Sequence, residues 1–227
     1  MNETLSKYGY TLTDSDIQNV IGSVKANLAK WQTKEVYSNC LGMVDLTTLN
    51  GTDTHSKVRA FTEKVNKAKE HYPDAPYPAS ICVYPNFASV VKEARTADFN
   101  ITVVSACFPS SQSFLEVKLK ECEIAVEQGA DEVDIVLALN AFLAGDYETA
   151  AEEIRQVRAC IDAVAARQGR QVHLKVILET GLLRETVASL PGLTLYANGD
   201  CDQFERILDT LIADEQDRLF HRTTQCE

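Results

Sequence analysis

The sequence lacks the features that mark several large classes of protein. It contains no apolar run of about 18 residues, the length that a membrane-spanning helix needs, and its first residues show no basic-then-apolar leader. Its 22 lysines and arginines are outnumbered by 33 acidic residues, which gives a formal net charge of −11, whereas nucleic-acid phosphates attract basic surfaces. We therefore expect a cytoplasmic protein that binds neither membranes nor nucleic acid. An anionic small molecule remains compatible with this charge, because a site depends on local charge.

Signatures of metals and cofactors are also absent. The seven cysteines are scattered without a C-x-x-C pair, and the four histidines form no H-E-x-x-H pattern. Neither a zinc site nor a disulfide framework is therefore indicated. No G-x-G-x-x-G or G-x-x-x-x-G-K-[ST] segment for nucleotide phosphates occurs either. We expect no bound metal and no cofactor.

What the sequence does contain is an alternation of two hydrophobic patterns. Apolar residues at helical spacing predict helices over 14–31, 58–68, 87–95, 113–128 and 146–167. Short apolar runs between them predict strands over 41–46, 81–84, 101–107, 133–139 and 173–179. Strands that are almost continuously apolar and alternate with amphipathic helices are typical of a parallel sheet buried on both faces.

Capping residues place several of the helix ends. Asp53 or Thr54 is expected to cap the second helix, because a side-chain oxygen there accepts a free backbone N–H. Ser113 and Glu116 have the spacing of a capping box for the fourth helix. Gly129 is expected to end that helix, because glycine readily adopts the left-handed conformation found after helix ends.

A barrel and a doubly wound sheet both fit this alternation. The missing nucleotide-binding motifs and the polar residues within strands (Asp45, Asp134, Lys175 and Glu179) favour a TIM-type (β/α) barrel, whose interior and rim hold the site. A full barrel has eight units, and five are used by residue 181. The remaining 46 residues predict one strand (193–196) and one helix (202–219). We therefore predict an incomplete barrel.

This interpretation divides the chain into three parts. Residues 1–38 form a helical extension, residues 39–182 form the barrel portion, and residues 183–227 form a divergent tail. The amphipathic helix of the extension could close the bottom of a barrel or pack at a dimer interface, and the sequence does not decide between these positions.

Asp134 and Lys175 are the first candidates for chemistry. An ionised carboxylate within an apolar strand such as 133–139 costs several kcal/mol unless it is paired. Asp134 is therefore one member of a structural ion pair, a solvated residue at the rim, or a catalytic acid and base. Lys175 lies on the next predicted strand and is its natural partner. A desolvated lysine can form a Schiff base, and a buried salt bridge is the structural alternative.

Asp45 and Cys82 are the second pair of candidates. Asp45 is followed by Thr47 and Thr48, and it could orient a substrate or organise the turn into the next helix. Cys82 lies within a predicted strand, where a small buried hydrophobe is the usual role. No activating neighbour is readable from the sequence, so a nucleophilic role for Cys82 is the weaker interpretation.

Five segments together resemble the deoxyribose-phosphate aldolase family, a group of class I aldolases built on a TIM barrel. They occur in the family's order and at its spacing, and they are residues 44–54 (Val-Asp-Leu-Thr-Thr-Leu-Asn-Gly-Thr-Asp-Thr), 80–85 (Ser-Ile-Cys-Val-Tyr-Pro), 108–112 (Phe-Pro-Ser-Ser-Gln), 129–137 (Gly-Ala-Asp-Glu-Val-Asp-Ile-Val-Leu) with Ala-Gly-Asp at 144–146, and 174–181 (Leu-Lys-Val-Ile-Leu-Glu-Thr-Gly). The resemblance extends from about residue 39 to residue 182.

The resemblance implies a carbon–carbon lyase of deoxyribonucleotide catabolism that needs no cofactor. Its expected reaction is the reversible cleavage of 2-deoxy-D-ribose 5-phosphate to acetaldehyde and D-glyceraldehyde 3-phosphate through a lysine imine. It implies that Asp134 transfers protons, that Cys82 lies close to the substrate, and that Lys175 lines the barrel interior. Asp45 is expected at the substrate from its place at the end of the first predicted strand. The expected partners are the sugar phosphate and aldehydes, and self-association into a homo-oligomer stays open.

The chain departs from the family pattern after Leu182. The family's imine-forming lysine lies in a Lys-Thr-Ser-Thr-Gly-Lys segment, and residues 183–227 contain no lysine at all. Lys175 is then the remaining candidate for the imine, because arginine stays protonated. Two alternatives to an active aldolase follow. One is a non-catalytic partial barrel from a truncated or frame-shifted product, and the other is a binding module that keeps a sugar pocket.

Overall fold

The structure is a computed structural model that describes residues 13–179 and 181–183. It divides into two compact units, one of Leu28–Leu178 and one of Met1–Asn27 with Glu179–Glu227. Each unit is described separately. In the smaller unit, the described residues form helix α2 (Asp14–Ala26) and a turn in which the Glu179 carbonyl accepts the N–H groups of Leu182 and Leu183.

The larger unit contains a sheet of five parallel strands in the order β1-β2-β3-β4-β5. The strands are β1 (Asp45–Thr47), β2 (Ser80–Val83), β3 (Asn100–Val104), β4 (Glu132–Val136) and β5 (His173–Ile177). Each strand pairs with the one before it in the chain, the arrangement of a (β/α) barrel wall. The predicted α/β architecture is confirmed.

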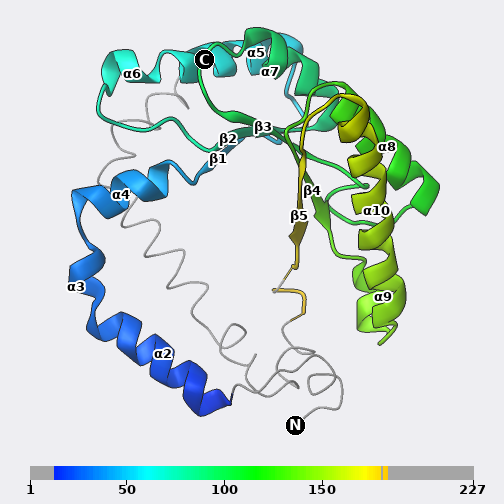
Figure 1. Ribbon diagram of the computed structural model, residues 1–227, viewed down its shortest axis with the longest axis horizontal. Coiled ribbons are helices and arrows are strands. Elements are labelled where there is room, and N and C mark those ends of the chain that lie inside the picture. Colours follow the sequence, from blue (N-terminus) through cyan, green and yellow to red (C-terminus); the bar gives the residue numbers. More distant parts are fainter. Residues whose placement is uncertain (1–12, 180, 184–227) are drawn as a thin grey trace. The chain divides into compact units, whose positions relative to one another are not determined.

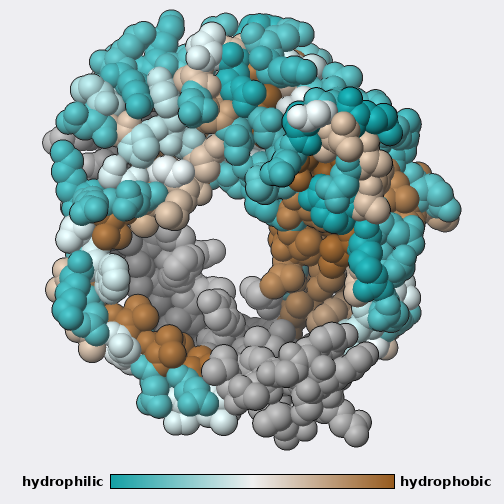
Figure 2. Space-filling model, in the orientation of Figure 1, coloured by the Kyte–Doolittle hydropathy of each residue, from teal (hydrophilic) through white to brown (hydrophobic). Residues whose placement is uncertain are grey.

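Helices connect these strands and cover one face of the sheet (Figure 1). The helices of this unit are α3 (Leu28–Trp31), α4 (Lys34–Leu41), α5 (His55–Asn66), α6 (Ala68–His71), the 3₁₀ turn η1 (Pro85–Phe87), α7 (Ala88–Ala94), α8 (Leu115–Glu127), α9 (Leu139–Leu143) and α10 (Tyr147–Arg167). In Figure 2, hydrophilic side chains dominate where α5, α6 and α7 lie, and hydrophobic side chains gather where β4 and β5 lie.

Strand residues alternate between the two faces of the sheet, and this alternation separates the core from the site. Ile81, Ile101, Val103 and Val133 are each 0% exposed and join the core cluster beneath the helices. Burial of each such side chain contributes about 1.5–3 kcal/mol. The residues between them (Ser80, Cys82, Thr102, Glu132 and Asp134) belong to the opposite face, because side chains alternate along a strand.

The half-buried carboxylate of Asp131 links three strands at their amino ends. Asp131 Oδ2 accepts hydrogen bonds from Arg95 Nη1 at 2.8 Å and from the Ile101 N–H at 3.0 Å. Its other oxygen, Oδ1, lies 3.3 Å from Arg170 Nη1. These contacts fix the amino ends of β3, β4 and β5 relative to one another.

Several predicted boundaries need correction. The expected strand 41–46 begins only at Asp45, because Leu41 ends helix α4, which begins after the Thr33 N-cap. The expected helix 14–31 is two helices, since Asn27 caps α2 and its side-chain amide donates to the Ser23 carbonyl. Glu179 lies beyond β5 with a φ of +53° and is not a strand residue.

The predicted caps have mixed outcomes. Thr54 is the N-cap of α5 and accepts the Lys57 N–H at 3.3 Å, as expected. Gly129 adopts a φ of +110° just after α8, also as expected. The capping box at Ser113 is wrong, because α8 begins one residue later and Phe114 occupies the N-cap without a side-chain bond.

Other predictions stay untested. The expected strand 193–196 and helix 202–219 lie outside the described residues, and the domain boundaries at 38/39 and 182/183 remain predictions. Of the helices in the described part, none is long and apolar enough to cross a membrane.

Candidate functional site

The candidate site is a cluster of three carboxylates around one lysine, on the sheet face opposite the helices. Lys175 Nζ lies 2.5 Å from Asp45 Oδ2, 2.9 Å from Glu132 Oε2 and 3.2 Å from Asp134 Oδ1. The sequence predicted Asp45, Asp134 and Lys175 as candidates, and the structure places all three within one cluster. Glu132 is an additional member.

Strand register explains how these residues meet. Asp134 and Lys175 are direct partners on β4 and β5, and Glu132 precedes Asp134 by two residues, so it faces the same side. Asp45 lies on β1, which does not pair with β5 in the described sheet. Its short contact with Lys175 therefore requires the sheet to curve, as the wall of a barrel does.

Neutral side chains on β2 and β3 connect the carboxylates. Ser80 Oγ donates to Asp45 Oδ1 at 2.7 Å, and Thr102 Oγ1 lies 2.7 Å from Ser80 Oγ and 3.2 Å from Glu132 Oε2. The Asn100 amide nitrogen donates to Glu132 Oε1 at 2.7 Å. Polar groups from all five strands thus form one continuous network, and most of its members lie at the amino ends of their strands.

The network holds Lys175 in its charged form. Burial alone would lower the pKa of Lys175, but hydrogen bonds to Asp45 and Glu132 and the charge of Asp134 outweigh this effect and raise it well above the ordinary value. Burial also acts to raise the pKa of Glu132, yet its hydrogen bonds from Asn100 and Lys175 outweigh that effect and lower it. Glu132 and Lys175 therefore form a stable ion pair.

Asp134 differs from Glu132 in the direction in which its pKa is shifted. Its pKa is raised, chiefly because its burial disfavours the charged form, although the charge and proximity of Lys175 oppose this effect. Its buried Oδ1 contacts Lys175 as an ion pair at 3.2 Å, but without the geometry of a hydrogen bond. Asp134 thus takes up a proton more readily than Glu132.

Cys82 lies in the same layer of the sheet but is not a reactive thiolate. It is 4% exposed and pairs in register with Thr47 on β1 and Thr102 on β3. Burial, together with the charge of Asp134, raises the pKa of its thiol to about 12. A thiol of this kind is protonated at neutral pH and is a poor nucleophile. This agrees with the structural interpretation of Cys82, and its expected role in substrate binding remains a prediction.

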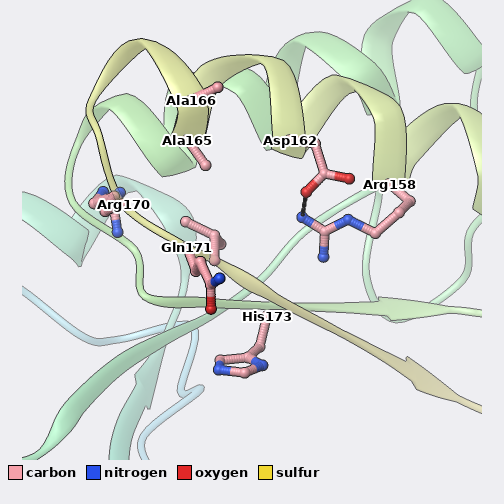
Figure 3. A pocket seen from close by; sticks show the side chains of 8 residues that line it. Arg158, Asp162, Ala165, Ala166, Arg170, Gln171 and His173 are labelled. Carbon is pink, nitrogen blue, oxygen red and sulfur yellow. Dashed lines mark hydrogen bonds and ion pairs between the residues drawn. The ribbon is translucent and has the colours of Figure 1, made fainter.

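A separate hollow lies away from this cluster. It has a volume of about 520 Å³ and is lined by the carboxyl end of α10 and the start of β5. Figure 3 shows Arg158 paired with Asp162 there, with His173 nearby. Arg170 donates to the carbonyl groups of Val126 and Ala130 and therefore serves the fold. The hollow does not bring together a nucleophile and a base, so we do not place the chemistry there.

No group of acidic, histidine and cysteine side chains in the described part is arranged to hold a metal ion. Sequence reasoning missed Glu132, Ser80 and Thr102. The two-residue spacing of Glu132 and Asp134 was the available signal, because it places both carboxylates on one face of a strand. The role of Ser80 and Thr102 depends on strand register, which the sequence did not supply.

Comparison with known proteins identifies similar chains. A family model described as "DeoC/LacD family aldolase" matches residues 40–189. The human deoxyribose-phosphate aldolase is 37% identical over 167 residues, which cover 68% of this chain and 48% of the human protein. A putative deoxyribose-phosphate aldolase of Caenorhabditis elegans is 34% identical over 179 residues, covering 78% and 56%. The chain therefore spans about half the length of these curated relatives.

Solved structures show the same fold. An aldolase named QR15 superposes with a TM-score of 0.52 at 26% identity, covering 70% of this chain and 65% of QR15. A putative deoxyribose-phosphate aldolase from Coccidioides immitis superposes with a TM-score of 0.55 at 24% identity, covering 84% of this chain and 71% of the other. The five-stranded sheet thus corresponds to part of the wall of an aldolase barrel.

Proposed function

We infer the function of this chain from its family: it belongs to the DeoC/LacD family of aldolases, and we propose that it serves the reaction of deoxyribose-phosphate aldolase. This reaction cleaves 2-deoxy-D-ribose 5-phosphate reversibly to acetaldehyde and D-glyceraldehyde 3-phosphate, in the breakdown of deoxyribonucleotides. Similarity to proteins with this name supports the proposal. The observation that carries it is the half-buried cluster of Lys175 with three carboxylates.

Asp134 is the proposed proton carrier. Cleavage of the bond between C2 and C3 removes a proton from the C3 hydroxyl and returns one to C2, which becomes the methyl group of acetaldehyde. A group that exchanges protons in this way works best when its pKa lies near the working pH. The raised pKa of Asp134 moves this carboxyl in that direction, and Lys175 stabilises its ionised form.

Lys175 is proposed to act as the counter-ion of this carboxyl. An imine forms only from a neutral amine, whereas a hydrogen bond to Asp45 at 2.5 Å and an ion pair with Glu132 at 2.9 Å hold Lys175 as an ammonium. The sequence-based expectation that Lys175 forms the imine remains a prediction, and these surroundings oppose it. Asp45 and Cys82 are proposed to contact the sugar from β1 and β2.

A second candidate function is binding of the sugar phosphate without its cleavage. The observation that favours it is the same charged state of Lys175. No lysine follows Lys175 in the sequence, and a charged Lys175 cannot form the imine that cleavage requires. In this case Asp45, Cys82 and Asp134 would line a pocket that holds the sugar, while its carbonyl group is never captured by an amine.

Two measurements on the purified full chain test these functions. Release of glyceraldehyde 3-phosphate from 2-deoxyribose 5-phosphate measures turnover, and borohydride reduction in the presence of acetaldehyde, followed by peptide mass mapping, locates any imine. Asp134→Asn is expected to abolish turnover. Glu93→Gln is the matched control, since this exposed residue pairs with Arg59 on the helical side.

Each outcome decides between the functions. Turnover that is lost in Asp134→Asn and kept in Glu93→Gln supports the aldolase. Saturable binding of the sugar phosphate without turnover, lost in Asp134→Asn, supports the second candidate. A reduced adduct on Lys175 would show that Lys175 is the imine former and would refute its role as a counter-ion. Absence of both turnover and binding would refute both functions.

A further inference from the structure

We infer that Glu132 is a positioning residue that, together with Asp45, fixes Lys175 as an ammonium and thereby leaves Asp134 as the carboxyl group free to exchange a proton. This inference deepens the proposed function, and its last clause rests on that function.

Glu132 is held on both of its oxygens. Oε1 accepts the Asn100 amide N–H at 2.7 Å. Oε2 lies 3.2 Å from Thr102 Oγ1 and 2.9 Å from Lys175 Nζ. The side chain is 12% exposed, so little water competes for these contacts. A carboxylate with partners on both oxygens is fixed in position and favoured in its ionised form.

Asp45 holds the same ammonium from the opposite side of the curved sheet. Its Oδ1 accepts the Ser80 hydroxyl at 2.7 Å, and its Oδ2 lies 2.5 Å from Lys175 Nζ. An ammonium group has three N–H donors, and the contacts to Asp45 and Glu132 are both shorter than the 3.2 Å contact to Asp134. Lys175 is therefore anchored mainly by β1 and by the start of β4.

The balance of charge then singles out Asp134. The titratable groups that face Lys175 come from β1 (Asp45), β2 (Cys82) and β4 (Glu132 and Asp134). Within the residues that the structure describes, Lys175 is the only cation that pairs with the three carboxylates. Binding of one proton reduces this excess of negative charge. Asp134 is the favoured place for that proton, because its buried Oδ1 lacks a hydrogen bond that would stabilise the ionised form.

Competitive labelling of lysines in the full-length protein tests this inference. Trace acetic anhydride acylates only neutral amines, and peptide mass mapping gives the extent of labelling at each lysine. Lys175 has 37% of its side chain exposed, so the reagent can reach it. Lys64 is exposed and serves as the internal reference. Lys118 is 2% exposed and reports on folding, because it is labelled only if the core opens.

Glu132→Gln keeps the shape of the side chain and removes its charge. At pH 8 this variant is expected to raise the labelling of Lys175 relative to Lys64 by ~10-fold, which corresponds to about one pKa unit. Lys118 should remain protected. Glu93→Gln, an exposed change on α7, should leave the ratio unchanged.

An unchanged Lys175 ratio in a folded Glu132→Gln variant would overturn the inference. If Lys118 becomes labelled because this variant does not fold, Asn100→Ala provides the second test. It releases Glu132 Oε1 and should raise the ratio several-fold, and no rise there would also overturn the inference. Because the labelling uses no sugar, its result is independent of turnover, so failure of the proposed function and failure of this inference are distinguishable.

Discussion

Replacing Lys118 by methionine should destabilise the chain strongly, because this lysine is buried beneath the loop that follows β3. Its Nζ lies 2.7 Å from Glu153 Oε1 on α10 and 3.0 Å from Ser111 Oγ, and the residue is 2% exposed. Ser111 has a φ of +55°, a conformation that non-glycine residues rarely adopt. The lysine therefore joins two helices and secures a strained loop.

The expected magnitude follows from the burial of both charges. At an effective dielectric constant near 20, opposite charges 2.7 Å apart attract each other by ~6 kcal/mol, and desolvation of each ion cancels much of this gain. Removal of one partner leaves the other charge buried, since the Glu153 side chain is 14% exposed. Lys118→Met should therefore lower the free energy of unfolding by about 3–5 kcal/mol.

Urea unfolding followed by circular dichroism measures this loss. The double variant Lys118→Met with Glu153→Leu removes both charges, and its stability should lie within about 1 kcal/mol of the original chain. Lys120→Met is the matched control, because this exposed lysine of the same helix pairs with Glu123 at the surface, and its replacement should leave the free energy of unfolding nearly unchanged. A loss below about 1 kcal/mol in Lys118→Met, or a double variant as unstable as the single one, would refute the reasoning.

Three further predictions concern single residues. Burial raises the folded-state pKa of Asp134 above its unfolded value. The stability that this carboxyl contributes is therefore present at acid pH and is lost as the pH rises through the raised pKa. Asp134→Asn should raise the urea midpoint more at pH 7 than at pH 4. Cys82, with a thiol pKa of about 12, should react with iodoacetamide at pH 8 about a thousandfold more slowly than an unperturbed thiol, whereas the exposed Cys40 should react readily. Gly129→Ala should cost about 1–3 kcal/mol in urea unfolding, because φ is +110° and the added Cβ would lie 2.5 Å from Lys92 Cδ.

The periodic elements were predictable because burial imposes their pattern. Four of the five strands and most helices of the described part occur where the apolar spacing placed them, and the first strand overlaps its predicted range only at Asp45 and Leu46. The prediction of a strand over 41–46 was wrong because Leu41 ends a helix and the residues after it form a turn. A short apolar run is compatible with a strand and also with the end of a helix. The missing capping bond at Ser113 depends on where α8 begins, which the local sequence does not determine.

The site was predictable in part for a related reason. Asp134 and Lys175 are conspicuous as charges within apolar runs, and adjacent strands bring them together. Glu132 opens its strand and looks like an ordinary polar boundary residue. Its role appears only when Asn100 and Thr102 of β3 are placed beside it. A single sequence does not determine the register between strands, so side-chain contacts that depend on register could not be predicted.

The sequential order of the sheet has a consequence for synthesis. Each strand pairs with the strand that precedes it in the chain, so every newly made segment finds its partner already outside the ribosome. Domains generally form in the direction of translation, and a wall assembled by nearest neighbours can lengthen one unit at a time. A substitution in β2 should therefore impair every later docking step, whereas one in β5 leaves the earlier assembly undisturbed.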